Sequence, residues 1–421
     1  MRRKMLFLGI DTSTHDAIRI AKELGIYTIV TDYNTPEARP EKAEADEYWM
    51  INVADMDVLY ERCLAEHVDG VFAGNHEFCL DKAKELCARL DLPFYATDDG
   101  WRCARDKGYF KELCARCGLE VPRTYMTEGC LESIDPGTIT YPAIVKPSDS
   151  CARQGLSICG NSDELAAAYD YALSASGNGR VIIEEYVEGD EIAADFMVVD
   201  GEPYITSFNF LVPIQIGDES VFVIALQKSR YRDDFVGKCM PEVRRLIKEL
   251  GWKNGPCFLQ AIVRDGRYFF LEFGGRLTGI GAWSHQEHYY HMSILRLALM
   301  MAAGMPVDGN DAELLGRNIQ YSMIYMPWLK KGRIADICGL DTVKGMHGVE
   351  IVLERYRAGD EVDTSGSMFG MAYYIVIAAD SLDDLCGKLR DINTRLSIRS
   401  NDGTEMLIKY EDYDKIRSYY G

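Results

Sequence analysis

Two lysines and the loop after one of them have the chemistry of an anion-binding site. Lys107 opens a predicted helix, and Lys146 ends an apolar segment. Small residues allow a loop to direct several backbone N–H groups at one anion, and a lysine adds a point charge. The alternative is a surface lysine beside an ordinary loop. The loop after Lys146, residues 148–155, contains small polar residues and a glycine: Ser148, Ser150 and Gly155.

Carboxylates at the end of another apolar segment could bind a nucleoside. Glu184 and Glu185 end the segment 181–185, and a glycine-containing turn leads on to Glu191. A purine needs an acceptor for its exocyclic amine and a donor for a ring nitrogen, and a linker between strands offers a backbone carbonyl and a backbone N–H side by side. A carboxylate further on can accept from both ribose hydroxyls. The alternative is a solvated acidic hairpin.

A third group of residues could hold a divalent cation. Glu272 lies within the apolar segment 269–273, and carboxylates are rarely buried unless they are paired or bind metal. Gln260 lies twelve positions earlier on the expected partner strand, and oxygen ligands of this kind suit Mg²⁺. Arg276 follows in a glycine-rich turn, where its planar guanidinium could hold a carboxylate or a phosphate.

The pairing of Gln260 with Glu272 depends on the turn between their strands. A two-residue loop at Asp265-Gly266 pairs positions whose numbers sum to 531 and puts the two side chains on opposite faces. Only an even sum, from a bulge or a three-residue loop, puts them on one face. We therefore expect a bulged or longer turn here.

The elements that must position these residues change in character along the chain. In the first hundred residues short β-branched segments alternate with amphipathic ones, which is typical of βαβ units and a parallel sheet. From Tyr141 onward, Asp-Gly dipeptides at 200–201 and 265–266 separate apolar segments and predict hairpins in antiparallel sheets. Short strands follow from Asn318, with one helix near 382–389. We expect an α/β and α+β multidomain protein that begins with a Rossmann-like parallel-sheet domain.

Composition restricts the class of protein further. The 421 residues carry a formal net charge of −20, and 47% of them are hydrophobic. The apolar content supports several cores, and the negative field argues against non-specific binding of nucleic acid or membrane surfaces. No segment reaches the ~18 consecutive apolar residues of a membrane span. Thirteen cysteines without a secretory signal indicate reduced thiols, so we expect a cytoplasmic enzyme.

In their order along the chain, these groups resemble the ATP-grasp superfamily, with the closest likeness to carboxylate–amine ligases and to carbamoyl-phosphate-synthase-like large subunits. The residues that carry the resemblance are Lys107, Lys146 with its loop, the segment 184–191, Gln260, Glu272 and Arg276. The resemblance implies a Rossmann-like domain that precedes the ATP-grasp fold, a two-part ATP-grasp domain and a small β-rich C-terminal domain. The expected ranges are 1–105, 106–190 for the lid subdomain, 191–310 for the large subdomain with the metal site, and 311–421.

The resemblance implies roles for the residues around the phosphates. Lys107 and Lys146 would contact the ATP phosphates, and the loop after Lys146 would close over them. Glu272, with Gln260 as the weaker partner, would hold Mg²⁺, with Mn²⁺ as an alternative. Arg276 would orient the reacting carboxylate and its acyl phosphate.

The resemblance also implies how the nucleoside is bound. Glu184 would face the adenine amine. Glu185 and Val187, which flank Tyr186, would offer backbone atoms to the base. Glu191 would bind the ribose, because its seven-residue offset from Glu184 fits the family pattern.

Two positions depart from the family pattern. Gln260 stands where many relatives carry an acidic residue, and Gly274 stands where most carry asparagine. The loss of both ligands leaves Glu272 as the one strong metal contact, with water or substrate to complete the shell.

The resemblance implies an ATP-dependent ligase with small-molecule carboxylate and amine substrates. The carboxylate would attack the γ-phosphate to give an acyl phosphate and ADP, and an amine such as an amino acid would then displace phosphate. A homodimer is an expectation at the level of the family. The alternatives are a carboxylase or kinase with the same fold, and an ATP-binding sensor with weakened catalysis, which Gly274 and Gln260 motivate. We expect the acceptor surface near 208–232 and near the histidines at 285–291.

Other motifs carry less weight. Residues 9–14 stand where a dinucleotide-binding loop would, but G-x-G-x-x-G is absent, and 11–15 are candidates for acceptor binding instead. Cys114 and Cys117 form a lone CxxC, which favours two buried helix cysteines over zinc. Three histidines recur at every third position and could form a metal-binding face or line a substrate pocket: His285, His288 and His291.

Overall fold

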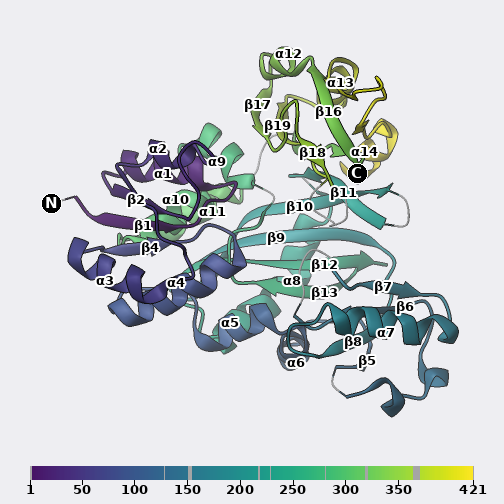
Figure 1. Ribbon diagram of the computed structural model, residues 1–421. Coiled ribbons are helices and arrows are strands. Elements are labelled where there is room, and N and C mark those ends of the chain that lie inside the picture. The colour runs from purple at the N-terminus through teal and green to yellow at the C-terminus, as the bar shows by residue number, and fades with distance from the viewer. Residues whose placement is uncertain are drawn as a thin grey trace.

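The computed structural model has a large central sheet with smaller units around it (Figure 1). The described residues are 2–127, 129–149, 154–216, 219–227, 229–279, 281–317, 321–363 and 370–420.

The N-terminal unit is a parallel sheet with helices, as the alternating pattern predicts. Its strands are β1 (Lys4–Leu8), β2 (Tyr27–Thr31), β3 (Glu47–Trp49) and β4 (Gly70–Phe72), in the order β3-β2-β1-β4. Its helices are α1 (Thr14–Glu23), α2 (Glu41–Glu44), α3 (Met56–Glu66) and α4 (Glu77–Leu90). The strands β1, β2 and β4 are almost wholly buried, because helices cover the sheet of a βαβ unit.

A small antiparallel sheet follows two connecting helices. The helices are α5 (Asp98–Arg105) and α6 (Lys107–Cys117). The strands are β5 (Thr124–Met126), β6 (Ala143–Pro147), β7 (Ser157–Cys159) and β8 (Val181–Glu185), in the order β5-β8-β6-β7. Helix α7 (Leu165–Ser174) packs on this sheet, and short 3₁₀ turns lie at Leu131–Ser133, Pro136–Thr138 and Ser162–Glu164. This unit lies at the lower right of Figure 1.

The centre of the molecule is an eight-stranded antiparallel sheet in the order β13-β12-β9-β10-β11-β14-β19-β17. The strands are β9 (Asp190–Val199), β10 (Glu202–Ile216), β11 (Glu219–Leu226), β12 (Gly255–Arg264), β13 (Arg267–Gly274), β14 (Tyr321–Tyr325), β17 (Val349–Glu354) and β19 (Tyr373–Ala379). The helices inserted between them are α8 (Arg232–Glu249), α9 (Ala282–Tyr290), α10 (Ile294–Ala302) and α11 (Gly309–Leu315). Strands from the ranges 191–310 and 311–421 therefore share one sheet.

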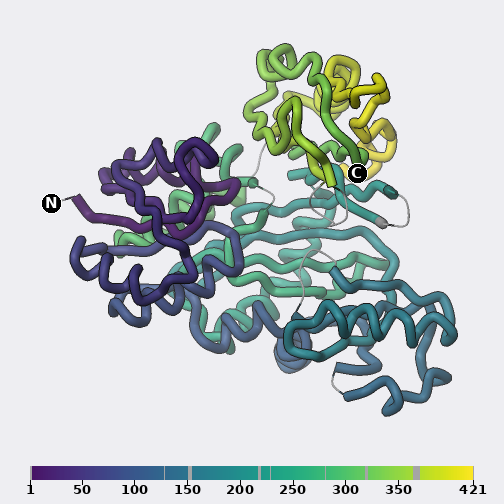
Figure 2. The backbone as a smooth tube through the Cα atoms, viewed as in Figure 1, coloured from purple at the N-terminus to yellow at the C-terminus, as the bar shows by residue number. Residues whose placement is uncertain are grey.

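The remaining C-terminal elements pack around the β14–β19–β17 side of that sheet. They are β15 (Trp328–Leu329), β16 (Gly332–Cys338), α12 (Leu340–Lys344), β18 (Glu361–Val362), α13 (Leu382–Arg395), β20 (Ser397–Ser400), β21 (Leu407–Ile408) and α14 (Tyr413–Tyr420). The last helix returns to the large sheet, where the Tyr419 ring lies 4.0 Å from the ring of Phe210. Figure 2 shows this yellow end of the chain near the teal strands, away from the purple N-terminus.

The β12–β13 hairpin contains the predicted bulge, although not at its turn. Asp265 and Gly266 both have positive φ, so the turn is a regular two-residue loop that pairs Arg264 with Arg267. The register then shifts between Gln260 and Ala261, because the β13 strand accommodates an extra residue there. The shift places Gln260 directly opposite Glu272. This register confirms the expectation that both side chains lie on one face of the large sheet. We call this face of the sheet the Glu272 face.

The opposite face of the large sheet carries the core. Phe235 of α8 lies 5.2 Å from the Phe208 ring and 6.2 Å from the Phe270 ring, and all three are buried. Because side chains alternate along a strand, this apolar covering leaves the Glu272 face available for polar residues.

Substitution of one glycine at the junction between the N-terminal unit and α10, with an exposed glycine as the control, tests how tightly this junction is packed. A Cβ on Gly70 of β4 would lie 2.3 Å from the carbonyl oxygen of Ala302 in α10, whereas a Cβ on Gly237 in the exposed part of α8 would meet no atom within 4 Å. We expect Gly70→Ala to destabilise the protein by about 1–3 kcal/mol through backbone displacement. Gly237→Ala should stabilise it by about 0.5–1 kcal/mol. Denaturant unfolding of both variants measures this, and equal effects would contradict the packing.

Candidate active site

A cavity of about 550 Å³ lies between the small sheet and the Glu272 face of the large sheet. Strands from both sheets supply its walls, as expected for a ligand clamped between two subdomains. Eight of the thirteen residues singled out in the sequence line it: Lys107, Lys146, Glu184, Tyr186, Val187, Glu191, Gln260 and Glu272.

The most buried charge at this cavity belongs to Glu184. Its side chain is 1% exposed and forms ion pairs with the ammonium groups of both Lys146 and Lys111. Burial would raise the pKa of Glu184, but the two lysines hold it below its ordinary value. The carboxylate is therefore ionised and fixes Lys146 at the cavity wall. Because both oxygens of Glu184 are paired with lysines, an adenine amine in this cleft would donate to main-chain carbonyls more readily than to this carboxylate.

Lys111 is a site residue that the sequence analysis missed. It lies one helical turn after Lys107 on α6, and it is buried. The spacing was a usable signal, because residues four apart lie on one side of a helix. Buried lysines are rare, however, so an isolated lysine on a helix is normally expected in solvent.

The segment between β8 and β9 leaves part of its main chain available for a base. The N–H of Glu185 donates to Arg123 O at 2.8 Å, and its carboxylate accepts from Arg264 Nη1 at 3.0 Å. Val187 is buried at the cavity, and within the described ranges its N–H donates to no backbone carbonyl. The Val187 N–H is thus available as a donor, as a purine ring nitrogen would require, while the Glu185 side chain is bound to Arg264.

The loop after Lys146 is only partly described. Ser148 is buried, its hydroxyl exchanges hydrogen bonds with Asn178 at 2.9–3.0 Å, and its carbonyl accepts from the N–H of Lys107 at 3.3 Å. Gly155 has a φ of +75°, and a Cβ there would lie 2.7 Å from Pro147. Ser148 and Gly155 do not line the cavity, and Ser150 lies outside the described residues. Ser148 instead joins the start of α6 to the small sheet.

Gln260 and Glu272 form an oxygen-donor pair at the floor of the cavity. Directly opposed side chains on neighbouring strands have Cβ atoms ~5 Å apart, which allows both to reach one cation. In the described part of the chain no three His, Cys, Asp or Glu side chains gather in a metal-binding cluster. The pair therefore suits a hard cation that takes its other ligands from water and phosphate, as Mg²⁺ does.

The glycine at position 274 is enforced by a neighbouring ring. A Cβ on Gly274 would lie 2.0 Å from Cε1 of Phe258. The asparagine that most relatives carry at this position would therefore collide with Phe258. The Phe258 ring in turn lies 5.1 Å from the guanidinium of Arg276.

Arg276 does not line the cavity. Its Nη2 lies 3.3 Å from Glu77 Oε1 of α4, and its Nη1 donates to Leu277 O at 2.9 Å. The guanidinium therefore sits between the N-terminal unit and the end of β13, beyond Glu272. Contact with a reacting carboxylate remains a prediction for this residue.

The C-terminal helix also contributes to the cavity, which the sequence did not indicate. Lys415 and Tyr419 of α14 line it, as does Arg230, whose guanidinium lies 3.2 Å from the carboxylate of Asp190. Residues this far apart in the sequence are brought together only by the return of the chain to the large sheet. Lys415 adds a further cation to a site suited to a polyanion.

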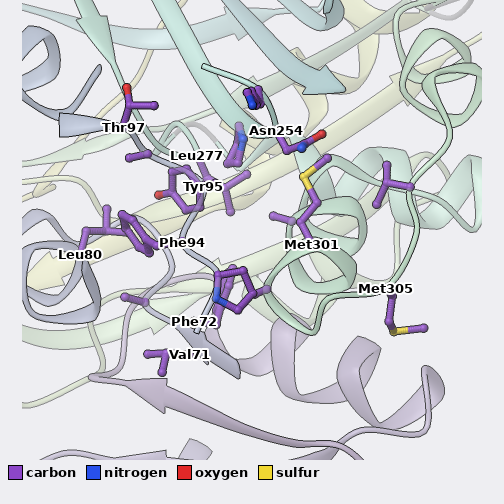
Figure 3. A pocket seen from close by; sticks show the side chains of 18 of the residues that line it. Val71, Phe72, Leu80, Phe94, Tyr95, Thr97, Asn254, Leu277, Met301 and Met305 are labelled. Carbon is purple, nitrogen blue, oxygen red and sulfur yellow. The ribbon is translucent and has the colours of Figure 1, made fainter. Parts of the chain in front are cut away.

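A second cavity, of about 740 Å³, lies between the N-terminal unit and α10 (Figure 3). Its walls include Phe72, Phe94, Tyr95, Met301 and Met305, whose side chains are labelled in the figure. The only charged side chains among its lining residues are one aspartate and one lysine, Asp200 and Lys253. Such apolar walls do not suit a triphosphate, whereas the smaller cavity has charged side chains that do.

The motifs set aside in the sequence have structural explanations. Cys114 and Cys117 are buried in α6, as predicted, and every described cysteine is free. His285 is buried, whereas His288 is exposed and lies 2.6 Å from Glu350, and His291 ends α9. The three histidines therefore do not share one metal-binding face. None of the described helices is both long and apolar enough to span a membrane.

A buried carboxylate lies further along the Glu272 face. Asp195 on β9 is 3% exposed, and its Oδ1 has no hydrogen-bond partner among the described residues. Burial raises the pKa of Asp195 to about 7, although Thr278 and Asn209 lower it in part. The sequence analysis did not single out this residue, because its burial depends on segments that are distant in the sequence.

Comparison with known proteins gives a family match and several relatives. Residues 139–283 match the model of the ATP-grasp domain. The 2-oxoglutarate carboxylase small subunit of Hydrogenobacter thermophilus is 31% identical over 307 residues, which are 66% of this chain and 62% of that protein. The carbamoyl phosphate synthase large chain of Methanocorpusculum labreanum is 23% identical over 312 residues, which are 71% of this chain and 29% of that protein. The chain thus spans less than two thirds of each.

A solved structure extends the match to nearly the whole chain. The crystal structure of an L-amino acid ligase from Bacillus licheniformis has a TM-score of 0.79 and 18% identity, and it covers 95% of this chain and 99% of its own. The multidomain fold expected from the sequence is confirmed by this likeness.

The pKa of Asp195 gives a testable dependence of stability on pH. Since folding raises this pKa from 3.8 to about 7, the folded state holds a proton that the unfolded state releases between these values. The stability contributed by Asp195 therefore falls as pH rises from about 4 to 7, by ~1.4 kcal/mol for each pH unit crossed. Asp195→Asn removes this dependence, so the stability of the variant relative to the wild type should rise between about pH 4 and 7. Urea unfolding at each pH measures the difference, and a constant difference would contradict the assignment.

Proposed function

Because residues 139–283 match the ATP-grasp domain, we propose that the protein is an ATP-dependent ligase that joins a small-molecule carboxylate to an amine. The observation that carries the proposal is the opposition, across one cavity, of the Lys146–Glu184–Lys111 cluster and the Gln260–Glu272 pair. Cations on one wall and oxygen donors on the other suit a triphosphate with its divalent ion.

The first step would be phosphoryl transfer to the carboxylate. A carboxylate oxygen attacks the γ-phosphorus, the bond to the bridging oxygen breaks, and ADP leaves. Lys146, held in place by Glu184, would lie against the phosphates, and the small sheet would exclude water that could hydrolyse the acyl phosphate. When bound by Glu272 and Gln260, Mg²⁺ or Mn²⁺ would neutralise charge on the phosphates.

The second step would form the amide. The amine, an ammonium ion in neutral water, loses one proton before it attacks the acyl carbon and one after. The C–N bond forms, the bond from the acyl carbon to the phosphate oxygen breaks, and phosphate leaves with the electron pair. No side chain of the protein needs to act as a nucleophile in either step.

The relatives support this reaction class and also one alternative. An L-amino acid ligase shares the fold over most of this chain, and carbamoyl phosphate synthase is a sequence relative. The most identical of the relatives named here is a carboxylase subunit, which favours carboxylation as a second candidate. ADP release that depends on bicarbonate would indicate a carboxylase. Release that depends on an acid and an amine together would indicate the ligase.

The first experiment is a screen for stimulated ADP release. Purified protein with ATP and Mg²⁺ is incubated with pairs drawn from the standard amino acids, small carboxylic acids and simple amines. The ligase proposal expects at least one pair to stimulate ADP release and to give a product whose mass equals acid plus amine minus water. ADP release without such a product would contradict it.

Glu272→Gln tests the oxygen-donor pair. We expect a loss of about 100-fold or more in substrate-dependent ADP release with an unchanged thermal midpoint, because a neutral amide binds a divalent cation poorly. Asp265→Asn, an exposed change in the turn of the same hairpin, is the matched control and should retain wild-type activity. Near-normal activity of Glu272→Gln would contradict the assigned role.

A further inference from the structure

A strip of buried polar side chains crosses the large sheet on the Glu272 face. Gln260 pairs with Ala193 of β9. Asp195 lies two residues further along β9, on the same face of the sheet, with its Cα ~7 Å from that of Ala193. Asp195 pairs in turn with Ser207 of β10. The strip continues across neighbouring strands, and each of its members is at most 3% exposed: Asp195, Ser207, Asn209, Gln227 and Ser322.

The middle of this polar strip is well satisfied by internal hydrogen bonds. Asn209 Nδ2 donates to Asp195 Oδ2 at 3.1 Å and to Ser207 Oγ at 3.0 Å. Gln227 Nε2 donates to Asn209 Oδ1 at 2.8 Å, and the Gln227 N–H donates to Ser322 O at 3.1 Å. These bonds hold the amides in a fixed orientation between the two ends of the strip.

Both ends of the polar strip are unsatisfied. Asp195 Oδ1 at one end and Ser322 Oγ at the other are buried without a partner in hydrogen-bond geometry in the part of the chain that the structure describes. Thr278 is near enough to lower the pKa of Asp195, but it forms no hydrogen bond of normal geometry with Oδ1. Buried polar atoms of this kind are rare in native proteins, and they often mark the place of a water or a ligand. Two unpaired oxygens on one face of one sheet therefore point to a polar occupant.

Helix α9 covers the polar strip. Gln286 Nε2 of this helix donates to Thr206 O of β10 at 2.8 Å, and Tyr289 OH donates to Glu350 Oε1 of β17 at 2.9 Å. Since β10 and β17 flank β11, β14 and β19 in the sheet, α9 passes above Gln227 and Ser322. His285 of α9 is buried, and its Nδ1 also has no partner within the described ranges. The helix thus adds a third unsatisfied atom.

We propose that the polar strip is the subsite for the amine substrate and that Asp195 Oδ1 binds its ammonium group. This inference rests on the proposed ligase function and names the part of the cleft where the second substrate lies. The strip begins beside the Gln260–Glu272 pair, where the γ-phosphate and the acyl phosphate would lie. The hydroxyl and imidazole at the far side suit an amine that carries further polar groups, as an amino acid does.

The charges around Asp195 agree with a cationic occupant. Arg276 lowers the pKa of Asp195 only through its field, because its own hydrogen bonds go to Glu77 and Leu277 O. Burial lowers the pKa of His285 to about 4, so its imidazole is neutral. A bound ammonium ion would supply the counter-charge that the carboxylate lacks.

The test separates amine binding from carboxylate activation. Hydroxylamine, which is small and uncharged at neutral pH, traps acyl phosphates as hydroxamates without a bound amine. With the acid and amine found in the screen, we expect Asp195→Asn to raise the KM for the amine about 10-fold or more. Hydroxamate formation by the same variant should stay within about twofold of wild type, and its thermal midpoint at about pH 7.5 should be equal or higher. Asp265→Asn is again the control.

Every outcome of this experiment either supports or overturns the proposed amine subsite. An unchanged KM for the amine in Asp195→Asn, or an equal fall in hydroxamate formation, would overturn the subsite. A lowered thermal midpoint with proportional loss of both reactions would assign Asp195 a structural role instead. If Asp195→Asn fails to fold, Ser322→Ala carries the same test with a two- to fivefold rise in KM expected. Absence of hydroxamate from wild-type protein would overturn the ligase proposal itself.

Discussion

The ionised carboxylate of Glu184, buried between Lys146 and Lys111, is the interaction on which the cleft depends. A buried charge of this kind is unfavourable unless it is paired, and removal of one partner leaves an uncompensated charge in the interior. The cluster joins α6, β6 and β8, which belong to different parts of the chain. It therefore fixes the small sheet to the connecting helix and holds an ammonium group at the cavity wall.

The large sheet meets this cluster with a single polar face. One bulge in β13 brings Glu272 opposite Gln260, and the regular alternation of β9 and β10 then carries the polar surface on to Asp195 and Asn209. The opposite face is apolar and packs on α8. The same alternation thus separates the core from the polar face that borders the cavity, and in our proposal this face runs from the phosphates to the acceptor. Phe258 lies on this path, and its ring explains why glycine is required at position 274.

The sequence predicted the classes of element, and many of the residues that line the charged cavity, better than it predicted how charges pair. The parallel and antiparallel units and the bulge followed from local patterns and strand parity. Asp195 and Lys415 could not be predicted, because their importance comes from burial or from contacts between distant segments. Lys111 had a local signal in its four-residue spacing from Lys107, but the sequence does not show that it is buried. Gln260 and Glu272 were found because their spacing is local to one hairpin. Arg276 matched a family position, but its bond to Glu77 comes from a helix far away in the sequence.

A crystal structure with Mg²⁺ and a non-hydrolysable ATP analogue measures the central claim most directly. We expect the base beside Val187, the phosphates beside Lys146, and the metal ion between the phosphates and Glu272. Nucleotide bound in the apolar cavity beside Met301, or a metal ion without Glu272 among its ligands, would contradict it.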